Sequence, residues 1–295
     1  MAEKENNFPD YITFPRTFEG YRWYKPIIAF IIGAVLFFVL QAILIFAFRE
    51  IYGVNVINGI LSGRYETLNT SDASVYFSYL SIVMFIPVIY VVSKIVRDRP
   101  FSSYSSSRGG WNWKIYFKCL SVPLAIYLAY YVISALTSNE SGASSQVSLT
   151  AMILSLILIP AQCIGEEYMC RGFLMQTFGS WFKNPFVAII IQAVIFAAVH
   201  SYNYLGVINV CITGVIFGVL SWRTNGLEAS SAIHSINNLM AFYTVALGLS
   251  SLSSTVSIID FVAVLSITLI SAVSLYYIGD KKGWFDEETP KNKLI

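Results

Sequence analysis

Eight long apolar segments dominate this sequence and limit the folds that are open to it. A helix that crosses a bilayer needs about 20 largely apolar residues, and most of the segments reach that length. The stretches between them are rich in Ser, Gly, Asn and charge, as turns in water are. The segments cover residues 26–48, 75–96, 115–136, 148–178, 185–202, 205–222, 228–250 and 255–279. We therefore predict an all-α fold, a polytopic transmembrane helical bundle of about eight spans.

Composition agrees with a membrane domain. Charged residues make up 12% of the chain and hydrophobic residues 56%, whereas a soluble domain has about 25% charged residues. The net charge of +2 favours neither nucleic acid nor acidic partners, so we expect membrane lipid around the chain and no nucleic acid. The first 25 residues lack the short apolar core and small-residue cleavage site of a signal peptide. The four cysteines lie in apolar segments and are interpreted as small core residues: Cys119, Cys163, Cys170 and Cys211.

Lys and Arg are distributed unevenly between the two sides of an eight-span bundle. The side with Arg49 and Arg64 is poor in them, and the other side holds the N-terminal segment, the charged loop around residues 94–114 and the C-terminal tail. Because Lys and Arg accumulate in cytoplasmic loops, both termini are predicted to be cytoplasmic. The domain organisation that follows is a cytoplasmic N-terminal segment (1–25), a transmembrane bundle (26–279, with a catalytic core at about 148–250) and a cytoplasmic tail (280–295).

The fourth segment is unusually long. Residues 148–178 would form a helix of about 46 Å, against a hydrocarbon core of about 30 Å. Pro160 lies inside it and is expected to kink or break the helix. Either the helix is strongly tilted or its outer part is a separate segment.

Few ionisable side chains lie inside the apolar segments, where they are costly and usually face a bundle interior or a wet cavity. Both histidines of the chain are among them. Asp260, near the outer end of the last segment, is interpreted as interfacial. The others are Glu166, Glu167, Arg171, His200 and His234.

Helical spacing groups these residues into three motifs. Glu167 and Arg171 are four residues apart and can form an ion pair on one face, while Glu166 points elsewhere. The pairs Phe196/His200 and His234/Asn238 have the same spacing, with Asn237 as an alternative register for Asn238. Counted along straight helices, Glu166 and His200 reach similar depth. His234 would remain shallower unless tilt or a break brings it in.

The three motifs, Glu166-Glu167-x-x-x-Arg171, Phe196-x-x-x-His200 and His234-x-x-x-Asn238, resemble those of the CPBP intramembrane proteases. This group, also called the Abi family, includes type II CAAX-prenyl endopeptidases and bacterial bacteriocin-processing or self-immunity proteins. The resemblance covers roughly residues 148–250. It implies an endopeptidase that hydrolyses peptide bonds of lipidated or leader-bearing membrane substrates. Bacterial relatives serve peptide maturation or immunity, and short loops favour a bacterial plasma membrane.

The resemblance also implies a role for each motif residue. Glu166 would activate water with help from His200, as a carboxylate in a low-dielectric cavity can do. His234 and Asn238 would stabilise the oxyanion, and Arg171 would hold Glu167. Two histidines and a glutamate are also adequate zinc ligands, so Glu166, His200 and His234 could bind a divalent metal instead. The zincin pattern H-E-x-x-H is absent, and the sequence leaves the metal open.

Other interpretations compete with this one. Each motif alone is more often structural: Glu167–Arg171 as an ion pair, and the histidines or Asn238 as hydrogen-bonding groups between helices. A non-catalytic bacteriocin self-immunity or partner-binding protein of the same fold is the main alternative function. A transporter that uses buried carboxylates as a relay would show inverted repeats, which the sequence lacks. Neither the substrate nor the oligomeric state can be predicted.

Overall fold

The structure is a computed structural model that describes residues 8–62, 71–137, 147–249 and 254–287. Every regular element in that part of the chain is a helix. Six helical stretches are long and apolar enough to cross a membrane, which indicates a multi-pass integral membrane protein. They are Lys25–Tyr52, Asp72–Val96, Trp113–Ile133, Leu149–Phe182, Tyr204–Arg223 and Ile258–Lys281.

The eight expected segments all correspond to helices, although only six pass as candidate spans. The helix α9 (Pro185–Ala198) is apolar but has only 14 residues. The helix α11 (Glu228–Ala246) has 19 residues and is rich in Ser, His and Asn, which lowers its hydropathy. The count of eight spans and the cytoplasmic placement of both termini stay predictions. The other α-helices are α1 (Lys25–Tyr52), α2 (Val54–Leu61), α3 (Asp72–Val83), α4 (Phe85–Val96), α5 (Ser102–Ser105), α6 (Trp113–Thr137), α7 (Leu149–Glu167), α8 (Gln176–Phe182), α10 (Tyr204–Arg223) and α12 (Ile258–Lys281).

Parts of three sequence predictions lie outside the described residues. They are the start of the N-terminal segment (1–7), the end of the tail (288–295) and the loop with Arg64 (63–70).

Short polar side chains fix where several helices begin. The hydroxyl of Ser148 accepts a hydrogen bond from the Ala151 N–H at 3.1 Å and caps α7. The same residue donates to the Asp72 carboxylate through its N–H and its hydroxyl, both at 2.7 Å. One residue thus caps α7 and ties it to the first turn of α3, in the way that N-caps satisfy free amides.

Pro160 does not break α7, although a kink or a break was expected there. The helix continues from Leu149 to Glu167 and passes into a π-helical segment, Tyr168–Met175, before α8. Proline is tolerated in membrane helices because neighbouring groups can satisfy the freed carbonyl. The departure from α-geometry therefore begins at Tyr168, directly after the two glutamates, and π-helical turns are frequent at functional sites.

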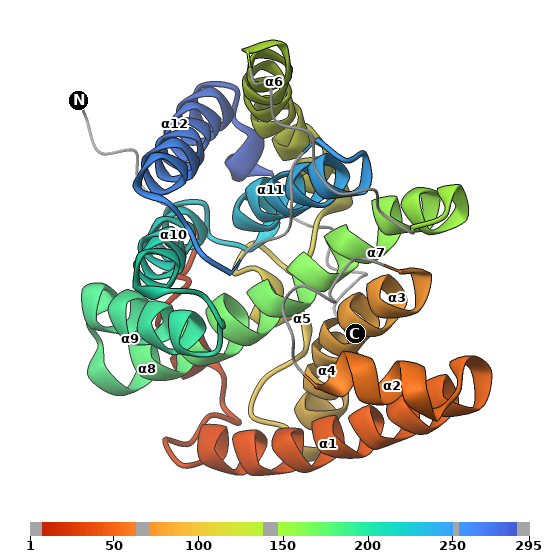
Figure 1. Ribbon diagram of the computed structural model, residues 1–295. Coiled ribbons are helices and arrows are strands. Elements are labelled where there is room, and N and C mark those ends of the chain that lie inside the picture. The colour runs from red at the N-terminus through yellow and green to blue at the C-terminus, as the bar shows by residue number, and fades with distance from the viewer. Residues whose placement is uncertain (1–7, 63–70, 138–146, 250–253, 288–295) are drawn as a thin grey trace.

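Helix α7 is the centre of the bundle. It runs obliquely between α11 on one side and α3 and α4 on the other (Figure 1). The antiparallel hairpin of α9 and α10 packs near its far end, and α12 packs on α10 and α6. At Gly165 the backbone of α3 comes so close that a β-carbon would lie 2.9 Å from the Ile82 carbonyl oxygen. Glycine at this position therefore sets the distance between α3 and the part of α7 that bears the glutamates.

The Ser-rich stretch Ser102–Ser107, which lies between the second and third apolar segments, is buried, unlike a turn in water. Ser102–Ser107 and the flanking Arg99 and Arg108 lie inside the end of the bundle that carries the N-terminal segment. Their backbone is bonded to the turn before α11: Leu227 N–H donates to the Ser105 carbonyl at 2.8 Å, and Ser107 N–H donates to the Asn225 carbonyl at 3.0 Å. We call residues 98–112 the polar plug. The plug displaces the start of α11 from the molecular surface, so that Glu228 is only 1% exposed.

Candidate functional site

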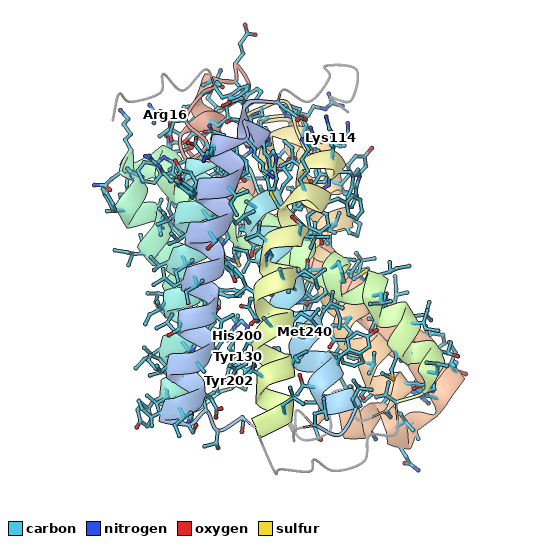
Figure 2. The ribbon with its side chains drawn as sticks, turned by 90° about the horizontal axis from the view of Figure 1, so that it is seen from above. Arg16, Lys114, Tyr130, His200, Tyr202 and Met240 are labelled. Carbon is cyan, nitrogen blue, oxygen red and sulfur yellow. The ribbon has the colours of Figure 1, made fainter. Side chains whose placement is uncertain are left out.

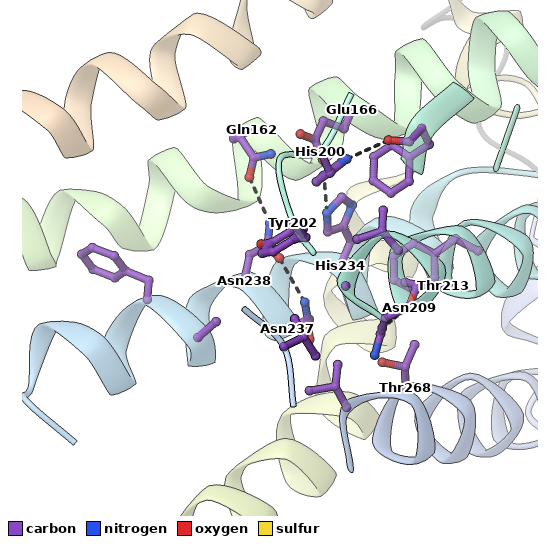
Figure 3. Close-up of a pocket in the computed structure, with 18 of the residues that line it drawn as sticks. Gln162, Glu166, His200, Tyr202, Asn209, Thr213, His234, Asn237, Asn238 and Thr268 are labelled. Carbon is purple, nitrogen blue, oxygen red and sulfur yellow. Dashed lines mark hydrogen bonds and ion pairs between the residues drawn. The ribbon is translucent and has the colours of Figure 1, made fainter. Parts of the chain in front are cut away.

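A cavity of about 430 Å³ lies between α3, α7, α10, α11 and α12. Its lining gathers the predicted motif residues from three separate segments of the chain, as Figure 3 shows. The polar side chains around it come from every one of these helices and from the α9–α10 linker. They are Ser78, Tyr79, Gln162, Glu166, His200, Tyr202, Asn209, Thr213, His234, Asn237, Asn238, Asp260 and Thr268.

The two adjacent glutamates face different partners, as helical geometry predicted. Glu167 is fully buried, and its Oε1 accepts a hydrogen bond from Arg171 Nη1 at 3.0 Å. Glu166 lines the cavity with a side chain that is 14% exposed. Between them lies His234, whose Nδ1 is 3.0 Å from Glu167 Oε1 and whose Nε2 is 3.3 Å from Glu166 Oε2. One histidine therefore bridges the two carboxylates.

Arg171 is held on several sides. Its guanidinium lies between the rings of Phe196 and Phe217, 4.8 Å and 5.4 Å from their centroids, and its Nη2 donates to the Gly214 carbonyl at 3.2 Å. Gln192 donates to the same carbonyl at 2.9 Å. Aromatic faces attract a guanidinium, so this cage fixes the cation that holds Glu167. Phe196, predicted from the second motif, thus packs on Arg171.

His200 lies beyond the end of its helix, not on a helical face as predicted. Helix α9 ends at Ala198, yet the ring folds back and its Nδ1 lies 2.7 Å from the Phe196 carbonyl oxygen. Because a carbonyl oxygen only accepts, Nδ1 is the donor, and in the neutral ring Nε2 carries the lone pair. His200 also packs edge-on against Phe196, with ring centroids 4.7 Å apart. The second motif therefore supplies a possible proton acceptor at the cavity wall.

Asn238 and Asn237 both line the cavity. Asn238 Nδ2 donates to Gln162 Oε1 at 3.3 Å, and Asn237 Nδ2 donates to Asn238 Oδ1 at 3.1 Å. A side-chain amide carries two N–H groups, so each asparagine keeps one more hydrogen to donate. Asn237 and Asn238 are therefore equally placed to donate a hydrogen bond into the cavity.

His234 lies at the depth of the two glutamates, although straight helices were expected to leave it shallower. Its helix begins below the polar plug, with Leu227 fully buried and Glu228 1% exposed, so the seventh residue of α11 is already at the depth of the glutamates. Helix α11 is unbroken from Glu228 to Ala246. The plug, which the apolar pattern does not show, supplies the missing depth.

Several cavity residues were not predicted. Gln162 lies one helical turn before Glu166 and could have been found by the same four-residue spacing. Asn209 and Thr213 are also one turn apart, and Thr213 Oγ1 lies 3.4 Å from Asn209 Oδ1. No pattern in the sequence around Thr268, on α12, predicts that it lines the cavity. Its place in the lining depends on how α12 packs against α10.

The arrangement does not fit a metal centre made of Glu166, His200 and His234. Within the described ranges, no group of three or more His, Cys, Asp or Glu side chains is placed to hold a metal ion. The Nδ1 atoms of both histidines are engaged by Glu167 and by the Phe196 carbonyl. Only the Nε2 atoms could therefore bind a metal, and His234 Nε2 lies 3.3 Å from Glu166 Oε2.

Fold and cavity together define a polytopic helical membrane protein with a buried carboxylate–histidine site. Comparison with known proteins agrees: residues 148–240 match the type II CAAX prenyl endopeptidase Rce1-like family. These residues are therefore a domain of the Rce1-like type II CAAX prenyl endopeptidase (CPBP) family.

A relative extends the similarity beyond that domain. The chain is 28% identical over 178 residues to the uncharacterized protein YyaK of Bacillus subtilis (strain 168), and the match covers 56% of this chain and 58% of the relative. The chain thus matches less than two thirds of that relative's length. No solved structure matches the chain.

Proposed function

We propose that the chain is an intramembrane endopeptidase in which Glu166 activates water for attack on a peptide bond. The observation that carries the proposal is the convergence of Glu166, His200, His234 and Asn238 on one cavity. Three sequence motifs from α7, the α9–α10 linker and α11 supply them. A bacterial plasma membrane is the location we favour, and lipidated or leader-bearing membrane substrates fit the family.

The proposed first step forms a tetrahedral intermediate. Glu166 takes a proton from water, while His200 Nε2 orients the same water through its lone pair. The oxygen of the water then bonds to the carbonyl carbon of the substrate. A positioned general base of this kind contributes about 10²–10⁴-fold to a rate.

In this proposal, His234 and Asn238 stabilise the oxyanion. With Nδ1 donating to Glu167, His234 donates from Nε2 when the ring carries both protons. Asn238 keeps one N–H after its bond to Gln162. The intermediate then collapses: the C–N bond breaks, Glu166 returns its proton to the leaving amine, and the new carboxyl group remains on the other fragment.

Glu167 and Arg171 act as positioning residues. Glu167 Oε1 receives both Arg171 Nη1 and His234 Nδ1 at 3.0 Å. The pair fixes the tautomer and the orientation of His234, as a buried carboxylate does for a catalytic imidazole. Because Arg171 is caged by two rings, this positioning does not depend on substrate.

The test is cleavage of a panel of lipidated and leader-bearing peptides by protein reconstituted in liposomes. Glu166→Gln keeps the shape of the side chain and removes the base, so we expect a loss of at least about 10²-fold. The matched control is Glu50→Gln, a glutamate exposed at the end of α1, which should cleave like wild type. A chelator arm should leave the rate unchanged. Equal rates for wild type and Glu166→Gln would overturn the proposal, and cleavage by neither would favour a non-catalytic immunity or partner-binding protein.

A further inference from the structure

The cavity has a buried floor and an exposed rim. Phe217 and His234, at the floor, are 1% and 5% exposed. At the other end of the lining, Tyr202 and Val256 are partly exposed and Asp260 is exposed. The linker and the start of α12 are joined there, since Asn203 Nδ2 donates to the Val256 carbonyl at 3.0 Å. Asp260 is thus the acidic residue of the exposed rim.

The rim lies at the end of the bundle that is remote from the N-terminal segment. Arg16 and Lys114 lie at one end in Figure 2, whereas His200 and Tyr202 lie in the opposite half. The contacts agree, because Arg16 donates to the Ser180 carbonyl in α8 and Lys118 donates to Glu287 in the segment after α12. Asp260 is in the first turn of α12, and Lys281 is in its last turn. A whole helix of about 36 Å separates the rim from the end with the termini.

Positive charge marks the end with the termini. Among the described residues, the loops there carry most of the Lys and Arg, and the opposite end carries Arg49. Since Lys and Arg accumulate in cytoplasmic loops, the rim of the cavity faces the non-cytoplasmic side.

The lining is electronegative and rich in hydrogen-bonding groups. It contains Glu166 and Asp260, and among the described lining residues there is no Lys or Arg. Asn209, Thr213 and Thr268 add amide and hydroxyl groups that suit a peptide backbone better than a lipid chain. A charged cleft with low-dielectric walls concentrates ligands of the opposite sign.

We infer that the site takes its substrate from the non-cytoplasmic side, as a peptide segment with a basic side chain that Asp260 engages near the scissile bond. The inference rests on the proposed endopeptidase function and adds the side of entry and the charge of the substrate. Asp260 also caps α12 by accepting from the Ser257 hydroxyl at 2.6 Å. That hydrogen bond holds the carboxylate at the rim without neutralising its negative charge.

The side of entry is tested by labelling, which needs no activity. Ser201, exposed in the α9–α10 linker, and Arg223, exposed at the end of α10, are each changed to Cys. The background is Cys211→Ala, because the other three native cysteines are buried. With a membrane-impermeant maleimide, Ser201→Cys should react in intact cells and Arg223→Cys only after permeabilisation. The reverse pattern would overturn the inference while leaving the endopeptidase proposal intact.

The charge of the substrate is tested with paired peptides. The two peptides differ only by Lys against norleucine near the cleaved bond, and wild type and Asp260→Asn are compared in detergent. Wild type should prefer the Lys peptide by about 5-fold in kcat/KM, in line with a partly exposed ion pair, and Asp260→Asn should lose that preference. Equal rates for the two peptides in wild type, or a preference that survives Asp260→Asn, would overturn the inference. If wild type cuts neither peptide and none of the earlier panel, the endopeptidase proposal fails as well, whatever the labelling shows.

Discussion

Two buried ion pairs lie next to the first two turns of α11, and they have different roles. Glu167 and Arg171 meet at 3.0 Å with both side chains fully buried, next to His234. Arg108 and Glu228 meet at 2.6 Å with both side chains 1% exposed, at the start of the same helix. By distance and burial the two pairs are nearly alike.

The two ion pairs differ in the groups that surround them. Glu167 shares its Oε1 with His234, whose other nitrogen faces Glu166 at the cavity. Glu228 instead accepts from the Asn112 N–H at 2.9 Å and from Arg108, both of which belong to the polar plug. One pair is thus connected to an open space through a histidine, and the other is enclosed by the backbone of the plug.

This difference shows how a membrane protein can use the same ionic chemistry for two purposes. A buried pair beside a cavity positions groups that act on a substrate. A buried pair inside a plug determines where a helix begins, and the carboxylate of Glu228 is favourable at the N-terminus of α11. Perturbing the two pairs should therefore affect different measurements.

The largest effect on stability is expected from Arg108→Met. The substitution leaves the Glu228 carboxylate buried without its cation, and breaking a buried pair costs about 3–5 kcal/mol. The measurement is thermal or denaturant unfolding in detergent. The double variant Arg108→Met/Glu228→Met removes both charges and should recover much of the loss. If the double variant is as unstable as the single one, the plug is held by something other than this pair.

Asn238→Ala should mainly affect the rate. Removal of one oxyanion donor raises the barrier by about 2.7–4 kcal/mol, whereas the asparagine is only partly buried, so the unfolding midpoint should change little. The readout is kcat on a peptide that wild type cleaves. Asn237→Ala is the matched neighbour and should cost less. A larger loss for Asn237→Ala would assign the donor to that register instead.

The residues at the cavity could be predicted from the sequence better than those of the polar plug. The length of each apolar segment locates the helices, because each must cover the hydrocarbon core. The four-residue spacing places Arg171 on the same helical face as Glu167, because both lie in one helical stretch. The end of α9 two residues before His200 has no cap signal, since Val199 follows a run of apolar residues. The depth of His234 depends on the burial of Ser102–Ser107 against α11. That burial is a tertiary property, which the polar composition of the stretch conceals.

Arg171→Met should lower stability less than Arg108→Met does. Glu167 keeps His234 as a donor at 3.0 Å, and the methionine can fill the space between Phe196 and Phe217. We expect a loss of about 1–3 kcal/mol, the usual effect of leaving a buried polar group partly satisfied. Activity should fall further than stability because His234 is no longer fixed, which a kcat measurement well below the unfolding midpoint would show. A variant that loses stability and keeps its kcat would mean that Arg171 is structural only.

The smallest effect is expected at a third ion pair, which is partly open to water. Lys118 Nζ is 2.6 Å from Glu287 Oε1, with side chains 29% and 33% exposed. This hydrogen bond lowers the pKa of Glu287, with help from Lys114. A carboxyl group whose pKa is lower in the folded state stabilises the fold above its unfolded pKa of about 4.3, and the contribution disappears as the pH falls through the folded pKa. Because exposed pairs contribute at most about 1 kcal/mol, Glu287→Gln should lower the unfolding midpoint slightly at pH 7, and the difference from wild type should shrink as the pH is lowered below the unfolded pKa. Tryptophan fluorescence during thermal unfolding over a pH series measures this, and a difference that does not change with pH would show that Glu287 acts through packing rather than charge.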